Sequence, residues 1–582
     1  MTTICSDPEE FADDQLAGFL DLHADRLSGV TGGVVAHRTS SPRVAVVLGG
    51  GSGHYPAFHG LVGRGLATAA VVGNVFTSPS AARAWSVARA ADEGRGVVFC
   101  VGRYAGDAMN FGIAVERLRR EGVDARLLMV TDDVASSDVV DERRGIAGLL
   151  AVVKAMGAAA ERGADVDEVE RVGRAANAAT RTLGVTFAGC SLPGSTGPLF
   201  TVPAGHLGLG LGIHGEPGIA DVPLPAAPQL AALLVDRLLE ERPSAAASAV
   251  APVLNGLGAT GDEELFLLWH EVAGRLRDAG LRLVDPAVGS FVTSLDMAGV
   301  SLSLQWLDDE LERLWTADCD APGLRRSRAA TEGLRPAVAA ADEADDAAVP
   351  DATDAAVALG HRVRSALAAA RDVVVLHEDD LGRIDAVAGD GDHGRGMVKG
   401  ARAAVSRVDA VDPRAGGAWL LTTAGRAWAA AAGGTSGVLW GAALEAAGAT
   451  LTDGRDAYPP EVVVDAVDAF AEAVVDLGRA AEGDKTLLDA LLPFARALRS
   501  GVAEGVELAT AWAAAAVVAT TAAATTAELR PRVGRARPLA EKSLGTPDAG
   551  ATSMALVLTA VGTVLAGPSD PALPVTTERT PA

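Results

Sequence analysis

The feature that most constrains the fold is a stretch rich in alanine, aspartate and glutamate at about Arg326–Asp351. Its run AADEADDAAVPDATDAA contains few large apolar side chains, so it contributes little to a hydrophobic core. A chain of 582 residues is also too long for one core. We therefore predict two folding units, residues 1–326 and 354–570, joined by a linker at 327–353 and followed by a tail at 571–582.

Short apolar runs alternate with amphipathic segments from about residue 40 to residue 320. RVAVVL (Arg43–Leu48), GVVFCVG (Gly96–Gly102) and ARLLMVTDD (Ala125–Asp133) read as buried strands that end in glycine or aspartate. Segments between them, such as AMNFGIAVERLRREG, have helical spacing with charges on one face. This order predicts an α/β unit with a parallel sheet and ligand-binding loops at the carboxyl ends of its strands.

The sequence changes character after the linker. Alanine, leucine and valine recur with helical periodicity in long segments such as LATAWAAAAVVATTAAATTAEL, and strand signals are scarce apart from short runs such as VVVL. We predict that this unit is all-α, with its helices joined by glycine-rich turns. The tail PSDPALPVTTERTPA is expected to be frayed.

Charge and cysteine usage restrict the class of partner. The 75 acidic and 50 basic side chains give a formal net charge of -25, which disfavours binding to nucleic acid and to anionic membranes. A phosphate site must then depend on backbone N–H groups and metal ions. The four cysteines form no CxxC pair, the N-terminus MTTICSDPEE is acidic, and no uninterrupted run of about 18 apolar residues is seen. We expect a soluble cytoplasmic protein with reduced thiols.

Three glycine-rich motifs in the first unit carry titratable side chains. LGGGSGHYPAFHG places His54 after a predicted strand, YAGDAMNFG places Asp107 after the next, and LGLGIHGEPG holds His214 between glycines. Each has a structural alternative, because Asp107 could be a helix N-cap and either histidine a packed side chain. His59 is better interpreted as a core or partly exposed imidazole. Together the three loops offer a base, an orienting group and a nucleophile, as a covalent site requires.

The second unit carries an acidic motif. IDAVAGDGDHGRGM places Asp385, Asp390 and Asp392 within eight residues. Carboxylate oxygens at this density suit Mg²⁺ that bridges phosphates, although a surface turn of aspartates and glycines is the alternative.

Three further segments of this unit suit a nucleotide. GGTSGVLWG opens an apolar helix, where backbone amides and hydroxyls can bind phosphate. GDKTLLDAL has a similar form, although Asp484 could be a cap and Lys485 a solvated surface charge. GRARPLAEKSLGTPDAGATS, with Arg535 and Arg537, could close over a nucleotide or simply join two helices. The chain has neither a P-loop nor the protein-kinase motifs, so any ATP site has a different architecture.

Taken in order, GGGSGHYPAF, YAGDAMNFG, GIHGEPG, AGDGDHG, GGTSG, GDKTLLDAL and SLGTPDAGATS resemble the motifs of the dihydroxyacetone kinase family, in its single-chain ATP-dependent branch. The resemblance covers nearly the whole chain. It implies an N-terminal α/β ketose-binding domain and a C-terminal helical barrel that holds ATP and Mg²⁺. Fusion of both domains implies the use of free ATP, unlike the branch of the family that is recharged by a phosphoprotein.

The resemblance also implies roles for individual residues. His214 would form a hemiaminal with the substrate carbonyl, Asp107 would act as base on the attacking hydroxyl, and His54 would hydrogen-bond the substrate and assist. The remaining substrate-binding residues would be Gly51, Ser52 and Gly53, and the magnesium ligands Asp385, Asp390 and Asp392. The nucleotide would be bound by Asp390, Gly391, Asp392, His393, Thr435, Ser436, Gly483, Gly534, Arg535, Arg537 and Asp548.

Departures from the family pattern leave the substrate open. The chain has GSGHYP where GSGHEP is common, and Gly102-Arg103-Tyr104 replaces a Lys-Asn-Tyr run that holds a substrate-contacting lysine. His393 stands where threonine or cysteine is frequent. Dihydroxyacetone and D- or L-erythrulose are therefore both retained as substrates. A non-catalytic ketose sensor and a nucleotide cyclase are the alternative functions, and a homodimer is the expected assembly.

Overall fold

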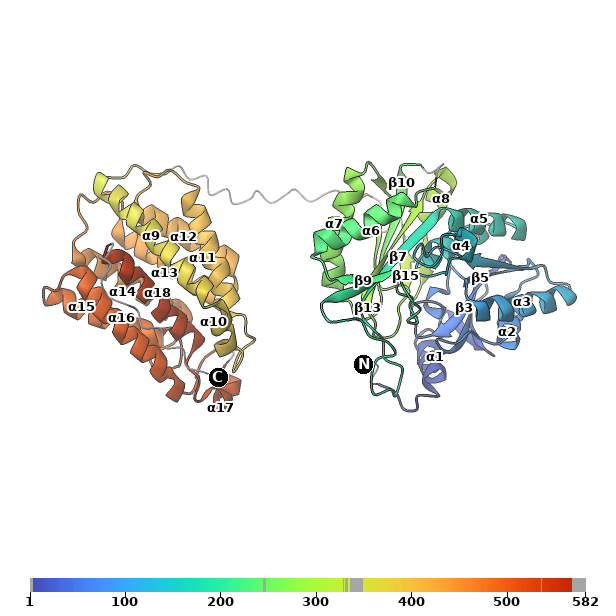
Figure 1. Cartoon of the computed structure of the whole chain (residues 1–582), viewed down its shortest axis with the longest axis horizontal. Coiled ribbons are helices and arrows are strands. Elements are labelled where there is room, and N and C mark those ends of the chain that lie inside the picture. The colour runs from blue at the N-terminus through green and yellow to red at the C-terminus, as the bar shows by residue number, and fades with distance from the viewer. Residues whose placement is uncertain are drawn as a thin grey trace. The chain divides into compact units, whose positions relative to one another are not determined.

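The computed structural model describes residues 4–243, 247–327, 329, 333–334, 349–534 and 536–567 (Figure 1). The chain forms two compact units, Met1–Ala337 and Val338–Ala582. Most of the predicted linker at 327–353, the predicted tail at 571–582 and Arg535 lie outside the described residues.

The first sheet of the first unit has the strand order β1-β2-β4-β3-β5-β6. The strands are β1 (Leu27–Val30), β2 (Gly33–Ala36), β3 (Ala45–Ser52), β4 (Ala69–Val75), β5 (Val97–Gly102) and β6 (Ala125–Val130). The last four pair in parallel, which confirms the predicted parallel strands, and the β1–β2 hairpin joins through an antiparallel pairing with β4. The helices of this part are α1 (Phe11–Leu22), α2 (Ala81–Ala91), α3 (Ala105–Arg120), α4 (Leu149–Glu161) and α5 (Val166–Ala178), with η1 (His59–Leu61) and η2 (Val140–Glu142).

The strand order creates a crevice beside β3. The chain passes from β3 to β4 on one side of β3, and β5 then pairs on the other side of β3. The connections that leave the carboxyl ends of β3 and β5 therefore run away from each other. In open α/β sheets ligands bind outside the carboxyl ends of the strands at such a point. His54 follows β3 and Asp107 lies in the first turn of α3 after β5, so the topology brings both to this crevice.

The second sheet has the order β11-β10-β13-β7-β8-β9, and β12 also pairs with β10. Its members are β7 (Thr180–Ala188), β8 (His206–Leu209), β9 (Ala220–Pro223), β10 (Ala249–Gly256), β11 (Arg282–Leu283), β12 (Ala287–Gly289) and β13 (Ala298–Trp306). The prediction of a parallel sheet is wrong here, because β13 pairs antiparallel with both β10 and β7. β7, β8 and β9 follow one another in the chain without an intervening helix, and they also pair antiparallel. The unit is completed by α6 (Ala227–Glu240), α7 (Asp262–Asp278), α8 (Asp309–Trp315) and the hairpin β14 (Cys319–Ala321) and β15 (Leu324–Arg326).

The regular elements described in the second unit are all helices, which confirms the predicted all-α fold. The run VVVL, which the sequence offered as a short strand signal, lies inside α9. The helices are α9 (Asp354–Leu376), α10 (Glu378–Asp385), α11 (His393–Asp409), α12 (Gly417–Ala432), α13 (Gly434–Leu451), α14 (Pro460–Gly478), α15 (Leu488–Ala503), α16 (Leu508–Thr525), α17 (Ala540–Ser543) and α18 (Ala549–Leu565), with η4 (Thr526–Glu528) and η5 (Arg537–Leu539).

The long helices of this unit form a closed ring. Each packs on the next in the order α9, α11, α12, α13, α14, α15, α16 and α18, and α18 returns to α9. Neighbours joined by short connections run antiparallel. The N-termini of α11, α13, α15 and α18 therefore lie at one end of the ring, together with every motif that the sequence marked in this unit.

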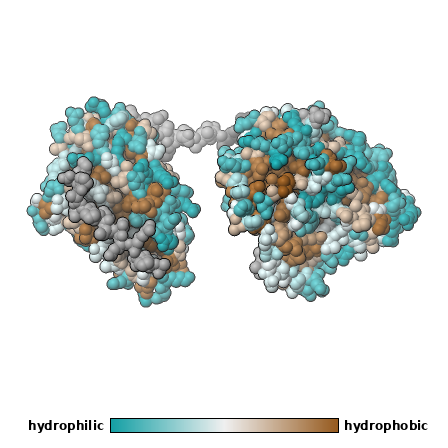
Figure 2. All heavy atoms as spheres, in the orientation of Figure 1, coloured by the Kyte–Doolittle hydropathy of each residue, from teal (hydrophilic) through white to brown (hydrophobic). Residues whose placement is uncertain are grey.

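Apolar and aromatic side chains fill the inside of the ring. The indoles of Trp428 and Trp440 stack with centroids 5.0 Å apart, and Phe494 meets Trp512 edge to face at 4.9 Å. A cavity of about 250 Å³ remains between these rings and the surrounding aliphatic side chains. Figure 2 shows hydrophilic side chains over much of the outer face of both units, as the formal net charge of -25 leads us to expect.

Among the described residues, one helical segment, Leu508–Glu528, is long and apolar enough to cross a membrane. It packs between α15 and α18 and buries Trp512, Ala515 and Ala519 in the core of the ring. Core helices of this kind pass the same test of length and composition, so the segment is weak evidence for a membrane span.

We predict that Trp428→Ala destabilises the second unit. The side chain is 1% exposed, and truncation of such a residue costs about 3–5 kcal/mol because it leaves a cavity. Urea unfolding followed by circular dichroism measures the loss. Leu376→Ala, at a position that is 77% exposed, is the control and should change the free energy of unfolding by less than about 0.5 kcal/mol. Equal effects of the two substitutions would contradict the described core.

Candidate functional site

A cavity of about 530 Å³ lies at the carboxyl ends of β3 and β5. All three titratable residues predicted for this unit, His54, Asp107 and His214, line it. Gly51 also lines the cavity. Ser52 is buried beside it, and its hydroxyl donates to the carbonyl oxygen of Gly73 (2.7 Å), which fixes the loop after β3. Gly53 has φ +98°, a conformation that favours glycine.

The imidazole of His54 is held in one tautomer. Its Nδ1 lies 2.7 Å from the carbonyl oxygen of Thr293, in the loop that follows β12. Because a carbonyl only accepts, Nδ1 carries the proton and Nε2 presents a lone pair. Burial lowers the pKa of His54 to about 3, so the ring is neutral at physiological pH.

His214 is oriented by a carboxylate that the sequence-based reasoning missed. Its Nδ1 donates to Oε1 of Glu216 (2.9 Å), and its backbone N–H donates to Oε2 (3.0 Å). Burial would raise the pKa of Glu216, but the hydrogen bond and charge of His214 outweigh it and hold the pKa at about 2. The signal was present in His-Gly-Glu, because the glycine at 215, with φ +84°, lets the chain turn the glutamate back onto the imidazole.

The two histidines meet directly. Nε2 of His54 lies 3.0 Å from Nε2 of His214, and the ring centroids are 5.0 Å apart. Since both Nδ1 atoms donate to oxygen, Nε2 is the nitrogen that each ring presents at this contact. The two Nε2 atoms therefore meet at the point where both rings face the cavity.

Asp107 faces the same cavity from α3. It is 8% exposed and accepts a hydrogen bond from Oγ of Ser78 (2.6 Å). Burial raises the pKa of Asp107, and the hydrogen bond from Ser78 and the charge of His214 oppose this shift. The alternative that Asp107 is the N-cap of α3 is wrong, since Tyr104 occupies that position. A buried carboxylate with a raised pKa is suited to accept a proton.

His59 and two residues that depart from the family pattern, Tyr55 and Gly102, take different positions relative to the cavity. The ring of His59 is buried against Phe19, with centroids 4.7 Å apart, outside the cavity, as its interpretation as a core residue predicted. Tyr55 packs on His59 with the two rings tilted by 46°, and it is 43% exposed. Gly102 does line the cavity, and a Cβ there would meet the carbonyl oxygen of Gly145 at 2.9 Å. A side chain at 102 would therefore displace the opposite wall.

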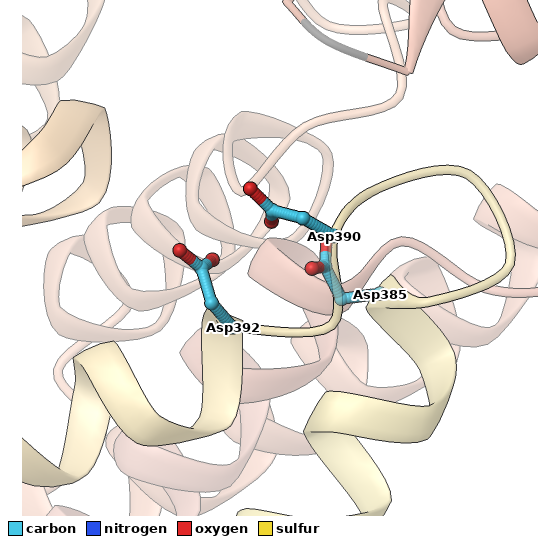
Figure 3. A group of neighbouring side chains, drawn as sticks. All are labelled: Asp385, Asp390 and Asp392. Carbon is cyan, nitrogen blue, oxygen red and sulfur yellow. The ribbon is translucent and has the colours of Figure 1, made fainter. Parts of the chain in front are cut away.

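In the second unit, Asp385, Asp390 and Asp392 gather between α10 and α11 (Figure 3). One carboxylate oxygen from each lies within 4.8 Å of the others. Asp385 also accepts a hydrogen bond from the backbone N–H of Gly391 (2.8 Å), which closes the loop. Hard oxygen ligands with no sulfur or imidazole among them fit Mg²⁺.

The predicted nucleotide residues lie at the same end of the ring. Burial lowers the pKa of His393, whose Nε2 lies 2.9 Å from Oγ of Ser553 on α18. Asp548 caps α18 by accepting from the backbone N–H of Ala551 (2.7 Å), and burial raises its pKa to about 6. Thr435 and Ser436 lie in the first turn of α13, the N–H of Gly483 donates to Asp489 (2.5 Å), and Gly534 and Arg537 are exposed.

Two alternatives for the GDKTLLDAL segment are wrong. Lys485 is 5% exposed, so it is not a solvated surface charge. Asp484 does not cap α15, because the N-cap residue is Leu487.

Comparison with known proteins gives the same division of the chain. Residues 17–323 match the Dak1 domain and residues 387–563 match the DAK2 domain. The D-erythrulose kinase of Mycolicibacterium smegmatis is 54% identical over 96% of this chain and 97% of its own length. The L-erythrulose kinase of Pectobacterium atrosepticum is 50% identical over 97% of each chain.

A solved structure supports the same relation. The dihydroxyacetone kinase of C. freundii in complex with AMP-PNP and Mg²⁺ aligns with a TM-score of 0.59 at 30% identity, over 96% of this chain and 99% of that one. The resemblance found in the sequence motifs is thereby confirmed. The chain belongs to the single-chain dihydroxyacetone kinase family.

Proposed function

We propose that this protein is an ATP-dependent kinase that phosphorylates a hydroxyl of a short ketose while the ketose is bound covalently to His214. The observation that carries the proposal is the orientation of His214, whose Nδ1 is held by Glu216 while its Nε2 faces His54 in the cavity. Only one nitrogen of the ring is thus available to a carbonyl group.

The covalent step uses the lone pair on Nε2 of His214, which adds to the carbonyl carbon. A C–N bond forms, the π electrons of the carbonyl move to its oxygen, and that oxygen takes up a proton from solvent. Nε2 of the neutral His54 then accepts a hydrogen bond from the new hydroxyl. The product is a hemiaminal, and Glu216 stabilises the positive charge on the imidazole of His214. Polyols such as glycerol lack the electrophile and are excluded.

Asp107 is the base for the transfer step. Its carboxylate removes the proton of a substrate hydroxyl as that oxygen attacks the γ-phosphorus of ATP. The bond from this phosphorus to the bridging oxygen breaks and ADP leaves, while Ser78 keeps the carboxylate oriented. The aspartate triad would hold Mg²⁺, which offsets the charge of the phosphates. The remaining nucleotide contacts would come from His393, Gly391, Thr435, Ser436, Gly483, Gly534, Arg535, Arg537 and Asp548.

A four-carbon ketose fits the first unit best. Relatives that are 47–54% identical over nearly their full length are named D- or L-erythrulose kinases. The cavity of about 530 Å³ has glycine walls at Gly102 and Gly145 and apolar walls at Phe58 and Phe76. The names of these relatives lead us to propose D- or L-erythrulose ahead of dihydroxyacetone. A non-catalytic sensor would have no use for the aspartate triad.

We also propose that the enzyme acts in the cytoplasm as a homodimer. Light scattering of the purified full-length chain tests the assembly, and a monomer at micromolar concentration would contradict it.

The reaction is tested by coupled ADP release with MgATP. We expect turnover with D- or L-erythrulose and with dihydroxyacetone, and none with glycerol. Asp107→Ala should reduce kcat by about 100-fold or more, because a general base contributes roughly 10²–10⁴-fold. Absence of turnover on every ketose by folded, Mg²⁺-supplied protein would favour the sensor.

Glu216→Gln tests the orienting carboxylate, and we expect it to raise the KM for the ketose by about tenfold or more. Because the pKa of Glu216 is about 2 in the folded protein and 4.5 ordinarily, its carboxylate stabilises the fold above about pH 4.5. That contribution is lost as the pH falls toward 2. Urea unfolding should therefore show a gap between wild type and variant at pH 7 that closes in acid. Glu240→Gln, at a side chain that is 70% exposed, is the control and should show no gap.

Asp390→Asn tests the metal triad. Removing one charged ligand should lower the affinity for Mg²⁺ and reduce ATP-dependent turnover by about 100-fold. Ketose binding, which belongs to the first unit, should be unchanged. Asp379→Asn, at an exposed position in the first turn of α10, is the matched control and should retain activity. Full activity of Asp390→Asn would rule out the triad as the magnesium site.

A further inference from the structure

Lys485 is a buried lysine with no role in the steps described above. It lies in the turn between α14 and α15 and is 5% exposed. Its φ is +62°, a left-handed backbone conformation that is disfavoured for residues with a Cβ. An ammonium group is also costly to bury unless it is paired. Two unfavourable features at one residue indicate that its contacts serve a specific purpose.

The contacts of Lys485 join two distant points of the chain. Its Nζ donates to the carbonyl oxygen of Leu529 (3.1 Å) and to that of Ser543 (2.7 Å). These two residues directly flank the segment Arg530–Lys542, so one ammonium group holds both ends of that segment together. The same turn contacts the segment a third time, since the backbone N–H of Arg532 donates to the carbonyl oxygen of Asp484 (3.1 Å).

The segment between the clamped ends is strongly basic, although the protein as a whole is acidic. RPRVGRARPLAEK contains five basic residues and one acidic residue, in a chain whose formal net charge is -25. Arg530 pairs with Glu541 across the segment (3.3 Å). Arg537 is exposed, and no ion pair of Arg537 is found in the part of the chain that the structure describes. Its guanidinium is therefore available to an anionic ligand.

A continuous set of contacts places the clamp beside the aspartate triad. The turn that holds Lys485 lies against α18, because a Cβ on Gly550, in the first turn of α18, would lie 3.4 Å from the backbone nitrogen of Leu487. One turn further along α18, Ser553 contacts His393, which follows the triad residue Asp392 in the chain. The clamp, the N-terminus of α18 and the triad therefore belong to one cluster of loops at the same end of the ring.

Resting on the ATP site proposed above, we propose that Lys485 is a positioning residue for nucleotide binding. Its ammonium holds the ends of Arg530–Lys542 together and so keeps Arg537 directed at the triphosphate. Lys485 acts through this segment and does not itself touch the nucleotide. A neutral side chain of similar length would fill the same space but would not donate to the carbonyl oxygen of Leu529, and the carbonyl oxygen of Ser543 would keep only the backbone N–H of Thr546 (3.2 Å).

The test uses the full-length chain with Lys485→Met. We expect the KM for MgATP and the Kd for Mg²⁺–AMP-PNP to rise by about tenfold or more, with kcat reduced less than threefold and the KM for the ketose unchanged. Trypsin should cleave after Arg532 and Lys542, which are not followed by proline, faster than in wild type. Lys542→Met removes an equal charge from the same segment without removing the clamp, and should change nucleotide affinity less than threefold. Lys485→Arg, which retains charge and donors, should restore much of the affinity.

Each other outcome decides against the proposal. Nucleotide affinity within twofold of wild type in a folded Lys485→Met protein would overturn it. If that variant loses helix content, Lys485→Gln, which retains one donor, replaces it. Unfolding of the second unit in both variants would assign Lys485 a structural role and overturn the proposal as well. Failure of the wild type to bind Mg²⁺–AMP-PNP would instead refute the ATP site, so the two failures are distinguishable.

Discussion

A single hydrogen bond, from Nδ1 of His214 to Oε1 of Glu216 (2.9 Å), determines which nitrogen of that imidazole faces the cavity. His54 is fixed in the same way, because its Nδ1 is hydrogen-bonded to the carbonyl oxygen of Thr293. The two rings reach the cavity from different sheets, His54 after β3 and His214 after β8. The mixed second sheet therefore contributes to the cavity, because it holds both His214 and the loop that fixes His54. A change that frees either Nδ1 would affect both rings at once.

The second unit solves a different physical problem, which is to bind a polyanion on a protein with a formal net charge of -25. Alternation of helix direction around a closed ring brings four long-helix N-termini to one end. Partial positive charge at those N-termini, oxygen ligands for Mg²⁺ and one basic segment are thereby concentrated in a small region. The fold supplies locally what the overall composition does not, and under the proposed function a divalent cation would offset the charge of the three aspartates.

The sequence predicted much of this arrangement, and the failures have physical causes. Apolar runs that end in glycine or aspartate marked β3, β5 and β6 correctly, since strands that are largely buried are read from composition alone. The antiparallel second sheet was missed because strand direction depends on pairing partners distant in the chain. Glu216 was missed because its role depends on a turn of the backbone at Gly215. Lys485 was misjudged because a charged residue in a polar turn is usually solvated, and only the tertiary structure shows the two carbonyl groups that bind it.

The central claim is that the ketose is bound as a hemiaminal on His214. It is tested most directly by ¹³C NMR of a ketose labelled at its carbonyl carbon, added to the full-length protein without nucleotide. Covalent binding to His214 predicts a new signal from a tetrahedral carbon bonded to nitrogen and oxygen, and this signal should be absent in His214→Ala. Saturation of the protein, verified by calorimetry, with only the signals of the free ketose and its hydrate in the spectrum would contradict covalent binding.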